Sequence, residues 1–396
     1  MAFTKKALFI SSLDWESPIR VGSHLLAKSL VEKGWRVGFV SYPVTPLHRL
    51  SKNKEDYNRR KAQNRGGYGK YFLNERLWSL VPWSLAVPRG VAPFDHKWFF
   101  NNWYRLSHQR LVEKVIKAGF GDVELLYFDN PYQNFWLKRI SHKKSVLRIA
   151  DANEGFEHFK SQEASVEKEL SLRVNLTVCS AKKMADVVRQ WGGAVDILPN
   201  GFDPASFVDN SPSSPHDLAC INGPKAIYVG SVNYWFDYQL LEGCARRLPE
   251  VAFVIIGPVA NMPERLKQFP NLHFLGRKAH SELGAYMRNS DVGIIPFDRA
   301  RYPQLVDSIN PLKLYEYLAC GLPVVSVPWQ ELKSIDPPVR YAEGVDQFAG
   351  AIKGSISDPH DPALGYRFIE SNRWDRITEL LLSKLDLSNT CEEGLP

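Results

Sequence analysis

Short apolar runs alternate with amphipathic stretches along most of this 396-residue chain. The first half contains ALFISS, WRVGFVSY, VELLYFDN, SVLRIAD and LTVCS, with the helical pattern HLLAKSLVEKG between the first two runs. The second half repeats the rhythm with AIYVGS, AFVIIG, LHFLG, DVGIIPF and LPVVSV. This alternation is typical of parallel strands joined by crossover helices. The chain therefore predicts two α/β sheets.

A segment crowded with Asn, Asp, Ser, Pro and Gly separates the two halves at residues 199–224. Such a composition indicates an interdomain linker. We expect an N-terminal domain over residues 1–200 and a C-terminal domain over residues 201–370. Residues 371–396 would form a helix that packs back across the cleft, followed by a tail.

The charge and the cysteine content of the chain indicate the kind of partner and the cellular compartment to expect. The net charge of +7 favours an anionic partner. The five cysteines include no Cys-x-x-Cys pair, which argues against a disulfide framework or a structural zinc site and favours a reducing cytoplasm. The apolar run in MAFTKKALFISSLDW is far too short to span a membrane, and we interpret it as the first buried strand.

An insert at residues 49–104 concentrates the positive charge. Nine Lys or Arg residues lie between Arg49 and Arg76 against three acidic residues, and a stretch rich in Trp and Phe follows directly. Basic residues beside clustered aromatic side chains suit an anionic membrane surface. An equally weighted alternative is a solvated loop followed by a core helix. Nucleic-acid binding is not expected, because no recognition motif accompanies the charge.

The stretch DSINPLKLYEYLACGLPVVS, at residues 307–326, places a Pro, a Lys and a Glu at the start of a predicted helix and a Gly and a Pro at its end. This sequence of residue types indicates a ligand site. If Pro311 occupies the first helical position, the free amides of the first turn and the charge of Lys313 can meet a phosphate. The carboxylate of Glu316 would then accept the hydroxyls of a ribose. Gly321 and Pro323 end the helix before a buried strand, as expected at the carboxyl edge of an open α/β sheet.

These segments resemble a known family. VGSVNYWFDYQLL, LHFLGRKAHSELGAYMRNSDVGIIPF, SINPLKLYEYLACGLPVVS and ESNRWDRITELL occur in the order and spacing of the donor half of a GT-B glycosyltransferase. The chain is most similar to the teichuronic-acid type glycosyltransferases and the xanthan-pathway glucuronosyltransferase. The resemblance implies the GT-B fold, in which two Rossmann-like domains face a central cleft. It also implies a nucleotide-sugar donor bound by the C-terminal domain and an acceptor bound by the N-terminal domain.

The resemblance also implies donor-site positions. The Gly-Ser turn would let backbone amides approach the diphosphate, Phe297 would flank the base or ribose, and His280 would lie near the uracil. Each has a structural alternative, because Gly230 can simply form a turn and His280 can cap a helix. The matching positions are Gly230, Ser231, Val232, His280, Phe297, Leu312, Lys313 and Glu316.

The first acid of the retaining members' glutamate pair is missing here. Eight residues before Glu316 stands Ser308, with Asp307 beside it. An inverting transfer instead needs a general base in the acceptor domain. Asp151 follows an apolar strand and matches the presumed base of the xanthan-pathway enzyme, although Asp151 and Glu154 would also fit a capping box.

The first loop, SSLDWESPIRVGSH, adds further candidates. Its resemblance to the xanthan-pathway enzyme runs through Asp14, Arg20 and His24. Arg20 and Asp14 are assigned to the diphosphate or the acceptor, and His24 is the second candidate for the base. Helix capping by Asp14 and Ser17 is the structural alternative. The chain contains no Asp-x-Asp triplet and no metal-ligand spacing, so we expect no metal or other cofactor.

Together these features predict a glycosyltransferase on the cytoplasmic face of the membrane. It would move a sugar from a UDP-sugar to a lipid-linked saccharide in cell-surface polysaccharide synthesis, inverting and independent of metal. A retaining transferase, a nucleotide-sugar epimerase and a non-catalytic saccharide-binding protein are the alternatives. A dinucleotide-dependent oxidoreductase is disfavoured, because SSLDWESP follows the first strand where a Gly-x-Gly-x-x-Gly turn would stand.

Overall fold

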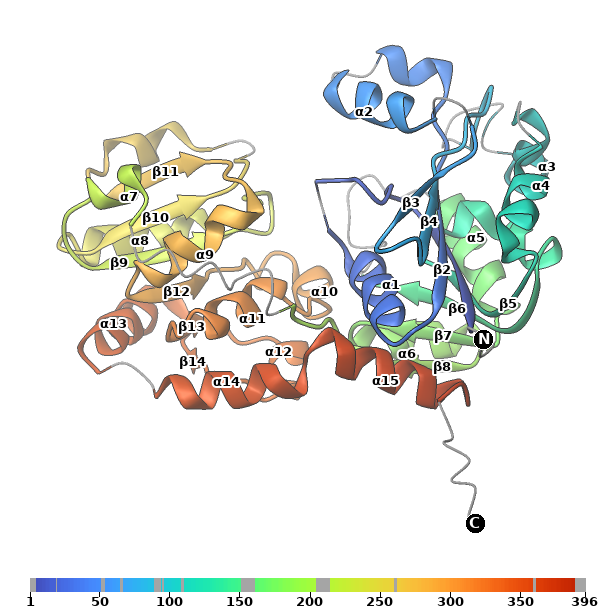
Figure 1. Cartoon of the computed structure of the whole chain (residues 1–396). Helices are drawn as coiled ribbons and strands as arrows, with labels where there is room; N and C mark the ends of the chain where they lie inside the picture. Colours follow the sequence, from blue (N-terminus) through green and yellow to red (C-terminus); the bar gives the residue numbers. More distant parts are fainter. Residues whose placement is uncertain are drawn as a thin grey trace. The chain divides into compact units, whose positions relative to one another are not determined.

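The computed structural model divides the chain into two compact units. The first contains residues 1–199 and 374–396, and the second contains residues 200–373. The structure describes residues 5–18, 20–50, 54–64, 67–88, 94, 96–107, 110–150, 161–203, 214–259, 262–358 and 361–388. Each unit is built around one sheet, and we describe them separately (Figure 1).

The sheet of the first unit has the strand order β3-β4-β2-β1-β5-β6-β7-β8 over the described residues. Neighbouring strands are parallel, except that β3 runs antiparallel to β4. Its strands are β1 (Lys6–Ser11), β2 (Arg36–Ser41), β3 (Lys70–Phe72), β4 (Leu77–Leu80), β5 (Asp122–Phe128), β6 (Ser141–Ile149), β7 (Leu176–Cys179) and β8 (Val195–Ile197).

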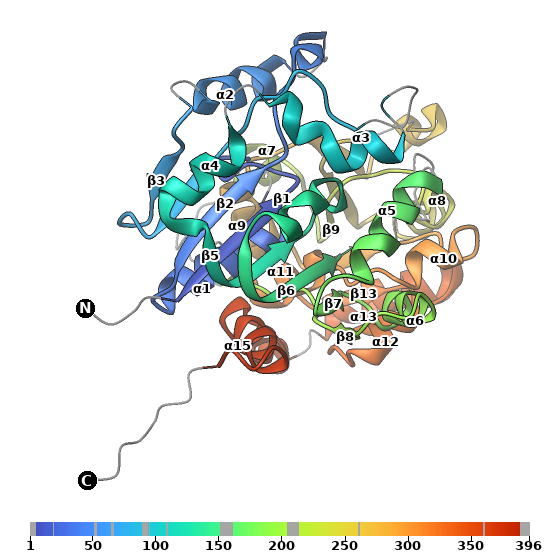
Figure 2. The ribbon, with the colours of Figure 1, turned by 90° about the vertical axis from the view of Figure 1, so that its right-hand side faces the viewer.

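Helices cover both faces of this sheet, because side chains of alternate strand residues point to opposite faces. Phe9 and Phe39 belong to a core with α1 (Gly22–Glu32) and α15 (Trp374–Lys384), which pack on each other (Figure 2). Leu8 and Val40 face the opposite core. The remaining helices are α2 (Lys54–Asn64), α3 (Lys97–Asn102), α4 (Leu111–Val115), α5 (Ser161–Ser171) and α6 (Lys182–Gln190), with short turns η1 (Pro46–Leu50), η2 (Trp103–Leu106), η3 (Ile116–Phe120) and η4 (Pro131–Lys138).

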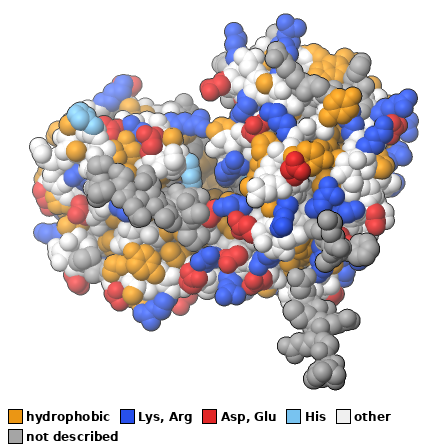
Figure 3. Space-filling model, in the orientation of Figure 1, with side chains coloured by type: hydrophobic (Ala, Val, Ile, Leu, Met, Phe, Trp, Pro, Cys, Tyr) orange, Lys and Arg blue, Asp and Glu red, His pale blue; other side chains and the backbone are white. Residues whose placement is uncertain are grey.

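The insert at residues 49–104 contributes to this core. Trp78 lies in β4 and is buried, as are Phe99, Phe100 and Trp103, whereas Trp98 is 57% exposed. The aromatic stretch is therefore mostly core, as in the alternative that combines a solvated segment with a core helix. Basic side chains lie over α2 and the adjoining surface (Figure 3).

The sheet of the second unit is wholly parallel over the described residues, with the strand order β11-β10-β9-β12-β13-β14. The order reverses between β9 and β12, which makes the carboxyl edge between them the expected ligand position of this topology. Its strands are β9 (Lys225–Val229), β10 (Ala252–Ile256), β11 (Leu272–Gly276), β12 (Val292–Ile295), β13 (Val324–Ser326) and β14 (Arg340–Tyr341).

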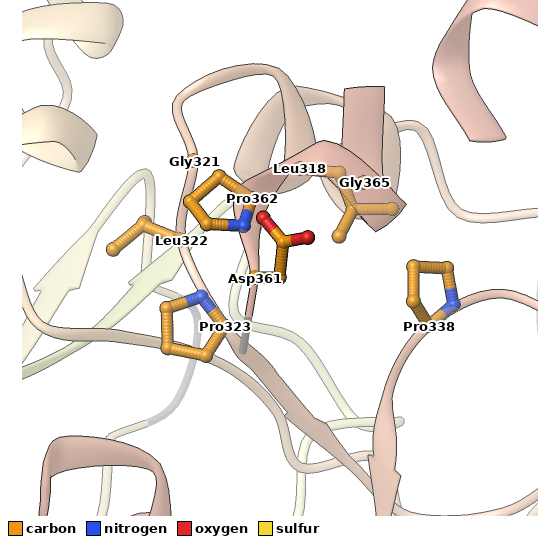
Figure 4. A pocket seen from close by; sticks show the side chains of 8 residues that line it. All are labelled: Leu318, Gly321, Leu322, Pro323, Pro338, Asp361, Pro362 and Gly365. Carbon is orange, nitrogen blue, oxygen red and sulfur yellow. The ribbon is translucent and has the colours of Figure 1, made fainter. Parts of the chain in front are cut away.

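Helices α8 (Tyr238–Arg247) and α13 (Gly344–Ser357) pack together, and so do α11 (Leu312–Ala319) and α14 (Pro362–Ser371). Beside α11 and α14 lies a gap of about 10 Å³, lined by Leu318 and Gly365 among others (Figure 4). That volume holds about one water molecule, so it is a packing gap. The other helices are α7 (His216–Ala219), α9 (His280–Arg288), α10 (Pro303–Val306), α12 (Gln330–Ser334) and the turn η7 (Glu264–Gln268).

The fold class predicted from the sequence is confirmed, since two α/β units with largely parallel sheets are present. The expected C-terminal helix forms as two helices, α14 in the second unit and α15 in the first. Over the described residues, no helix is long and apolar enough to cross a bilayer.

Candidate functional site

The carboxyl end of β9 carries a glycine that the local geometry requires. Gly230 has a φ of +139°, a conformation that side chains disfavour. A Cβ at this position would lie 3.2 Å from Cε of Lys313. The adjacent Gly257, at the end of β10, has the same φ, and a Cβ there would lie 2.1 Å from the Gly230 carbonyl oxygen. The two glycines thus let a backbone turn and a lysine side chain approach closely.

The turn offers fewer amides than the sequence suggested. The Gly230 N–H donates to the Ile256 carbonyl at 2.9 Å, and the Val232 N–H donates to the Pro258 carbonyl at 2.9 Å. Val232 is fully buried, so its side chain belongs to the core. Of the three amides, only that of Ser231 donates to no backbone carbonyl in the described part of the chain, and Ser231 is exposed. Among the three described residues of this turn, Ser231 therefore supplies the amide that remains for a ligand.

Helix α11 begins at Leu312, one residue later than the sequence suggested. Pro311 precedes the first turn as its cap residue and has no side-chain hydrogen bond to it, so the expected place of Pro311 at the first helical position is wrong. Leu312 is 40% exposed at the helix start. The amino end and its positive dipole still lie beside Lys313, as an anion site needs.

The ammonium group of Lys313 lies between two aromatic rings. Its Nζ is 4.9 Å from the centre of the Tyr228 ring and 4.7 Å from that of Phe297. Aromatic faces attract cations, but they replace little of the lost hydration. Burial accordingly lowers the pKa of Lys313 to about 8, although Glu316 opposes the shift. An anionic ligand would stabilise the protonated form of Lys313, because it supplies a counter-ion.

His280 and Glu316 are brought together from different helices. Nε2 of His280, the first residue of α9, lies 3.6 Å from Oε1 of Glu316 in α11. The carboxylate raises the pKa of His280. At the N-terminus of α9, the Glu282 carboxylate accepts a hydrogen bond from the N–H of the cap residue Ala279 at 2.9 Å. Glu282, and not His280, is therefore the capping side chain.

Two tyrosines that the sequence analysis did not select support this site. The Tyr228 hydroxyl donates to the Ser231 carbonyl at 2.9 Å, and the Tyr317 hydroxyl accepts from the Val229 N–H at 2.8 Å. They fix the turn after β9. Phe297 is 2% exposed and packs on Trp329, which makes it a wall of the lysine site and leaves little of its ring for a base. The one signal that could have found the two tyrosines is their place near the end of a strand and of a helix.

The position of the first acid of the retaining pair, eight residues before Glu316, holds Ser308, with Asp307 beside it. Ser308 is buried and its hydroxyl donates to the Leu305 carbonyl at 2.7 Å. The carboxylate of Asp307 accepts from Arg299 Nε at 2.7 Å and from the Gln330 N–H at 3.2 Å. A hollow of about 430 Å³ adjoins this pair, lined by Asp237, Leu240, Phe297, Arg299, Ala300, Pro303, Val327, Pro328, Glu343 and Gly344.

Asp14, in the first unit, is 1% exposed and binds the insert. Its carboxylate accepts from Arg59 Nη2 at 2.7 Å and from Gln63 Nε2 at 2.9 Å, both in α2. Arg60 Nε lies 3.7 Å away. Arg20 is exposed, and its guanidinium lies 5.2 Å from the centre of the Trp15 ring. The structure therefore gathers basic insert residues around a predicted site residue, which the sequence did not indicate.

His24 is held as a structural residue. It is 1% exposed, its Nε2 lies 2.9 Å from the Asp14 carbonyl oxygen, and its Nδ1 accepts from the Val21 N–H at 3.4 Å. Burial lowers the pKa of His24. With one ring nitrogen donating and the other accepting, no basic nitrogen remains for an acceptor hydroxyl. The geometry thus disfavours His24 as the base.

Asp151, the first candidate for the base, lies outside the described residues, as does Glu154. The strand before it, β6, ends at Ile149 on the carboxyl edge of the sheet. At the same edge the structure adds Asp129, directly after β5, whose carboxylate accepts from the Ser11 hydroxyl at 2.8 Å and the Ser12 N–H at 2.7 Å. Burial raises the pKa of Asp129. Its position after a buried strand is the signal that would have found it.

In the described ranges, no three His, Cys, Asp or Glu side chains are grouped closely enough to hold a metal ion.

Two families match the chain. Residues 9–155 match the family described as "Glucuronosyltransferase GumK, N-terminal domain", and residues 223–358 match "Glycosyl transferases group 1". A curated relative, "Putative teichuronic acid biosynthesis glycosyltransferase TuaH" of Bacillus subtilis, is 28% identical over 159 residues. That match spans 38% of this chain and 39% of the relative's length.

Solved structures share the fold. Sucrose-phosphate synthase from Thermosynechococcus elongatus superposes with a TM-score of 0.67 and 14% identity over 96% of this chain and 98% of that one. Anabaena Alr3699/HepE in complex with UDP-glucose gives a TM-score of 0.62 and 15% identity over 96% and 99%. These likenesses concern the architecture, while the two family matches concern the sequence. Residues in both halves of the chain thus match glycosyltransferase families, and the architecture is the GT-B fold predicted from the sequence.

Proposed function

We propose that the protein transfers a sugar from a UDP-sugar to a lipid-linked saccharide in cell-surface polysaccharide synthesis. The observation that carries this proposal is the ring-enclosed ammonium of Lys313 at the amino end of α11, with Glu316 and His280 beside it. The similarity to TuaH supports the pathway, and the UDP-glucose complex of HepE supports the donor.

In this proposal Lys313 and the Ser231 amide bind the diphosphate. Both lie at the carboxyl edge of the sheet, where the helix dipole also favours an anion. The carboxylate of Glu316 accepts hydrogen bonds from the ribose hydroxyls. His280 stays next to Glu316 and orients it. The same cationic groups take up the charge of the departing UDP, so no metal ion is required, and we expect activity to survive EDTA.

We propose inversion at the anomeric carbon, with Asp151 as general base. The base removes the proton of the acceptor hydroxyl while its oxygen attacks the anomeric carbon and the bond to UDP breaks. The ion pair between Asp307 and Arg299 favours this over a retaining route, because the carboxylate beside the position of the missing first acid is already engaged. Product anomeric configuration separates the two routes, and an epimerase would transfer nothing.

The decisive experiment is calorimetric titration of UDP with wild type and Asp151→Asn, paired with hydrolysis of a panel of UDP-sugars. We expect both proteins to bind UDP and only wild type to turn over one sugar. Asp122→Asn is the matched control, because Asp122 is exposed at the start of β5, on the amino edge of the same sheet. Absence of UDP binding would overturn the donor site, and an active Asp151→Asn would overturn the base.

We also propose that the first unit docks peripherally on the anionic inner face of the membrane. Exposed aromatic residues support this, with Tyr68 at 81% and Trp98 at 57% exposure, next to basic residues of the insert. Arg59 and Arg60 are unsuitable probes because they hold α2 in place. The test is co-sedimentation of Tyr68→Ala/Trp98→Ala with phosphatidylglycerol vesicles, where undiminished binding would count against docking.

A further inference from the structure

Three guanidinium groups converge on one buried carboxylate in the first unit. Asp14 stands three residues after β1, at the carboxyl edge of the sheet, and both Arg59 and Arg60 reach it from α2. Arg20 follows on the same loop, close enough for its charge to interact with that of Asp14. Arg59 also pairs with Asp56. Three cations thus face two carboxylates, which leaves a net charge of +1.

These guanidinium groups use little of their hydrogen-bonding capacity. Among the described residues, each donates through one nitrogen: Arg20 Nη1 to the Trp15 carbonyl, Arg59 Nη2 to Asp14 and Asp56, and Arg60 Nη2 to the Tyr42 carbonyl. The Nε atoms of Arg59 and Arg60 are buried with no acceptor in that part of the chain. Buried donors without acceptors are rare in proteins, so these two call for an explanation, and a bound anion is one.

The loop that carries the carboxylate is rigidly held. His24 Nε2 lies 2.9 Å from the Asp14 carbonyl oxygen, and the Ser17 N–H donates to the same oxygen at 3.0 Å. Trp15 packs against His24 and Phe39, with the Arg20 guanidinium over its outer ring. The cations are therefore in place before a ligand binds. The entropy of ordering their side chains is lost when the protein folds and does not weaken binding.

We propose that Arg20, Arg59 and Arg60 form a site for the diphosphate of the lipid-linked acceptor, with Asp14 as its internal counter-ion. The planar forks of arginine match phosphate oxygens, and the exposed Arg20 with the 26% exposed Arg59 side chain gives access. Asp14 keeps the cations together when no ligand is bound. This inference rests on the proposed transferase function, and it names where the acceptor's charged group binds.

The test titrates geranyl diphosphate and inorganic pyrophosphate into protein saturated with UDP, so that the donor site is occupied. Arg20→Gln is the main variant because, among the described residues, Arg20 forms no hydrogen bond or ion pair with α2. We expect its dissociation constant for geranyl diphosphate to rise about tenfold, and that of Arg20→Lys by about threefold, because lysine keeps the charge without the fork. Arg76→Gln, an exposed change in the same insert, is the control and should bind like wild type.

Two further titrations are needed. One distinguishes a lipid headgroup from the acceptor diphosphate as the source of phosphate, and the other distinguishes the arginine site from the donor site. Phosphatidylglycerol vesicles offer the same chemistry from a membrane; dependence on Arg20 with vesicles alone would overturn the acceptor diphosphate as ligand. Repeating the titration without UDP in Lys313→Met shows the site independently of the donor site. Wild-type affinity in both Arg20→Gln and Arg59→Gln would overturn the inference, whereas a failure of wild type to bind UDP would concern the donor site only.

Discussion

The two sheets place positive charge at their carboxyl edges in opposite ways. In the second unit a single ammonium, Lys313, lies between the rings of Tyr228 and Phe297. In the first unit the guanidinium groups of Arg59 and Arg60 surround the buried carboxylate of Asp14. In the part of the chain that the structure describes, Lys313 forms no ion pair within 4 Å, whereas Arg59 and Arg60 both lie within 4 Å of the Asp14 carboxylate.

The difference teaches that burial acts on the two kinds of cation differently. Burial lowers the pKa of Lys313 to about 8, so its charge depends on pH and on the presence of an anion. A guanidinium stays protonated throughout the usual pH range, so its charge is permanent. The lysine site is therefore destabilised until it is filled, whereas the arginine site is stable while empty.

Removing the internal carboxylate should have the largest effect. Asp14→Ala leaves Arg59 and Arg60 partly buried without their shared partner, and we expect a loss of about 3 kcal/mol in the free energy of unfolding. Thermal unfolding measures the loss. Glu16→Ala is the control, because the Glu16–Lys70 pair is exposed and should contribute less than about 1 kcal/mol. Equal effects would mean that Asp14 does not organise the cluster.

Replacing the enclosed ammonium should separate stability from binding. Lys313→Met keeps the length of the side chain and removes the buried charge, so we expect a higher melting temperature without ligand. UDP should bind about 30-fold more weakly, a loss of about 2 kcal/mol. Calorimetry and scanning fluorimetry measure the two effects. Lys333→Met, at an exposed position of α12, should change neither, and a less stable Lys313→Met would contradict the comparison.

Proton uptake on binding would sharpen the contrast. An anion raises the pKa of Lys313 from about 8, so near pH 8.5 UDP should bind with uptake of a fraction of a proton. Without ligand, the unfolded chain binds more protons than the folded one between pH 8 and the ordinary lysine value, so stability rises with pH across that window. Titrations in buffers of different ionisation enthalpy measure the uptake. Geranyl diphosphate at the arginine site should show none.

The smallest expected effect concerns His280. Its pKa is raised by Glu316, so the imidazolium persists to a higher pH than usual and is lost as pH rises through that value. We expect His280→Gln to weaken UDP binding about twofold at pH 6, by about 0.5 kcal/mol, and by less at pH 8. A loss that is equal at both pH values would show that the charge of His280 plays no part.

Much of the architecture could be predicted from the sequence, because buried parallel strands leave a strong apolar pattern. The runs ALFISS and AIYVGS became β1 and β9. The short strands β3, β4, β8 and β14 were not predicted, since runs of two to four residues leave no clear period. The composition of the aromatic stretch left two alternatives open, because clustered Trp and Phe residues suit both a membrane surface and a protein core.

The candidate site was predictable where one local segment defines it. Lys313 and Glu316 stand in the same helix, and the proximity of Lys313 to Gly230 follows from the topology of the sheet. Contacts between distant segments were not predictable. Nothing in the sequence indicates that α2 reaches Asp14 across 45 residues, and the hydrogen bonds that hold both nitrogens of His24 appear only in three dimensions.

The position of α15 bears on how the protein is made. Leu26 and Leu30 of α1 share a core with Ile377 and Leu381 of α15, yet the whole second unit is translated between them. While the ribosome synthesises residues 200–373, the nascent first unit exposes an apolar helix face that later residues cover. The second unit is continuous in the chain and has no such delay, so it can fold first although it is synthesised second. A chaperone would therefore meet this protein at α1.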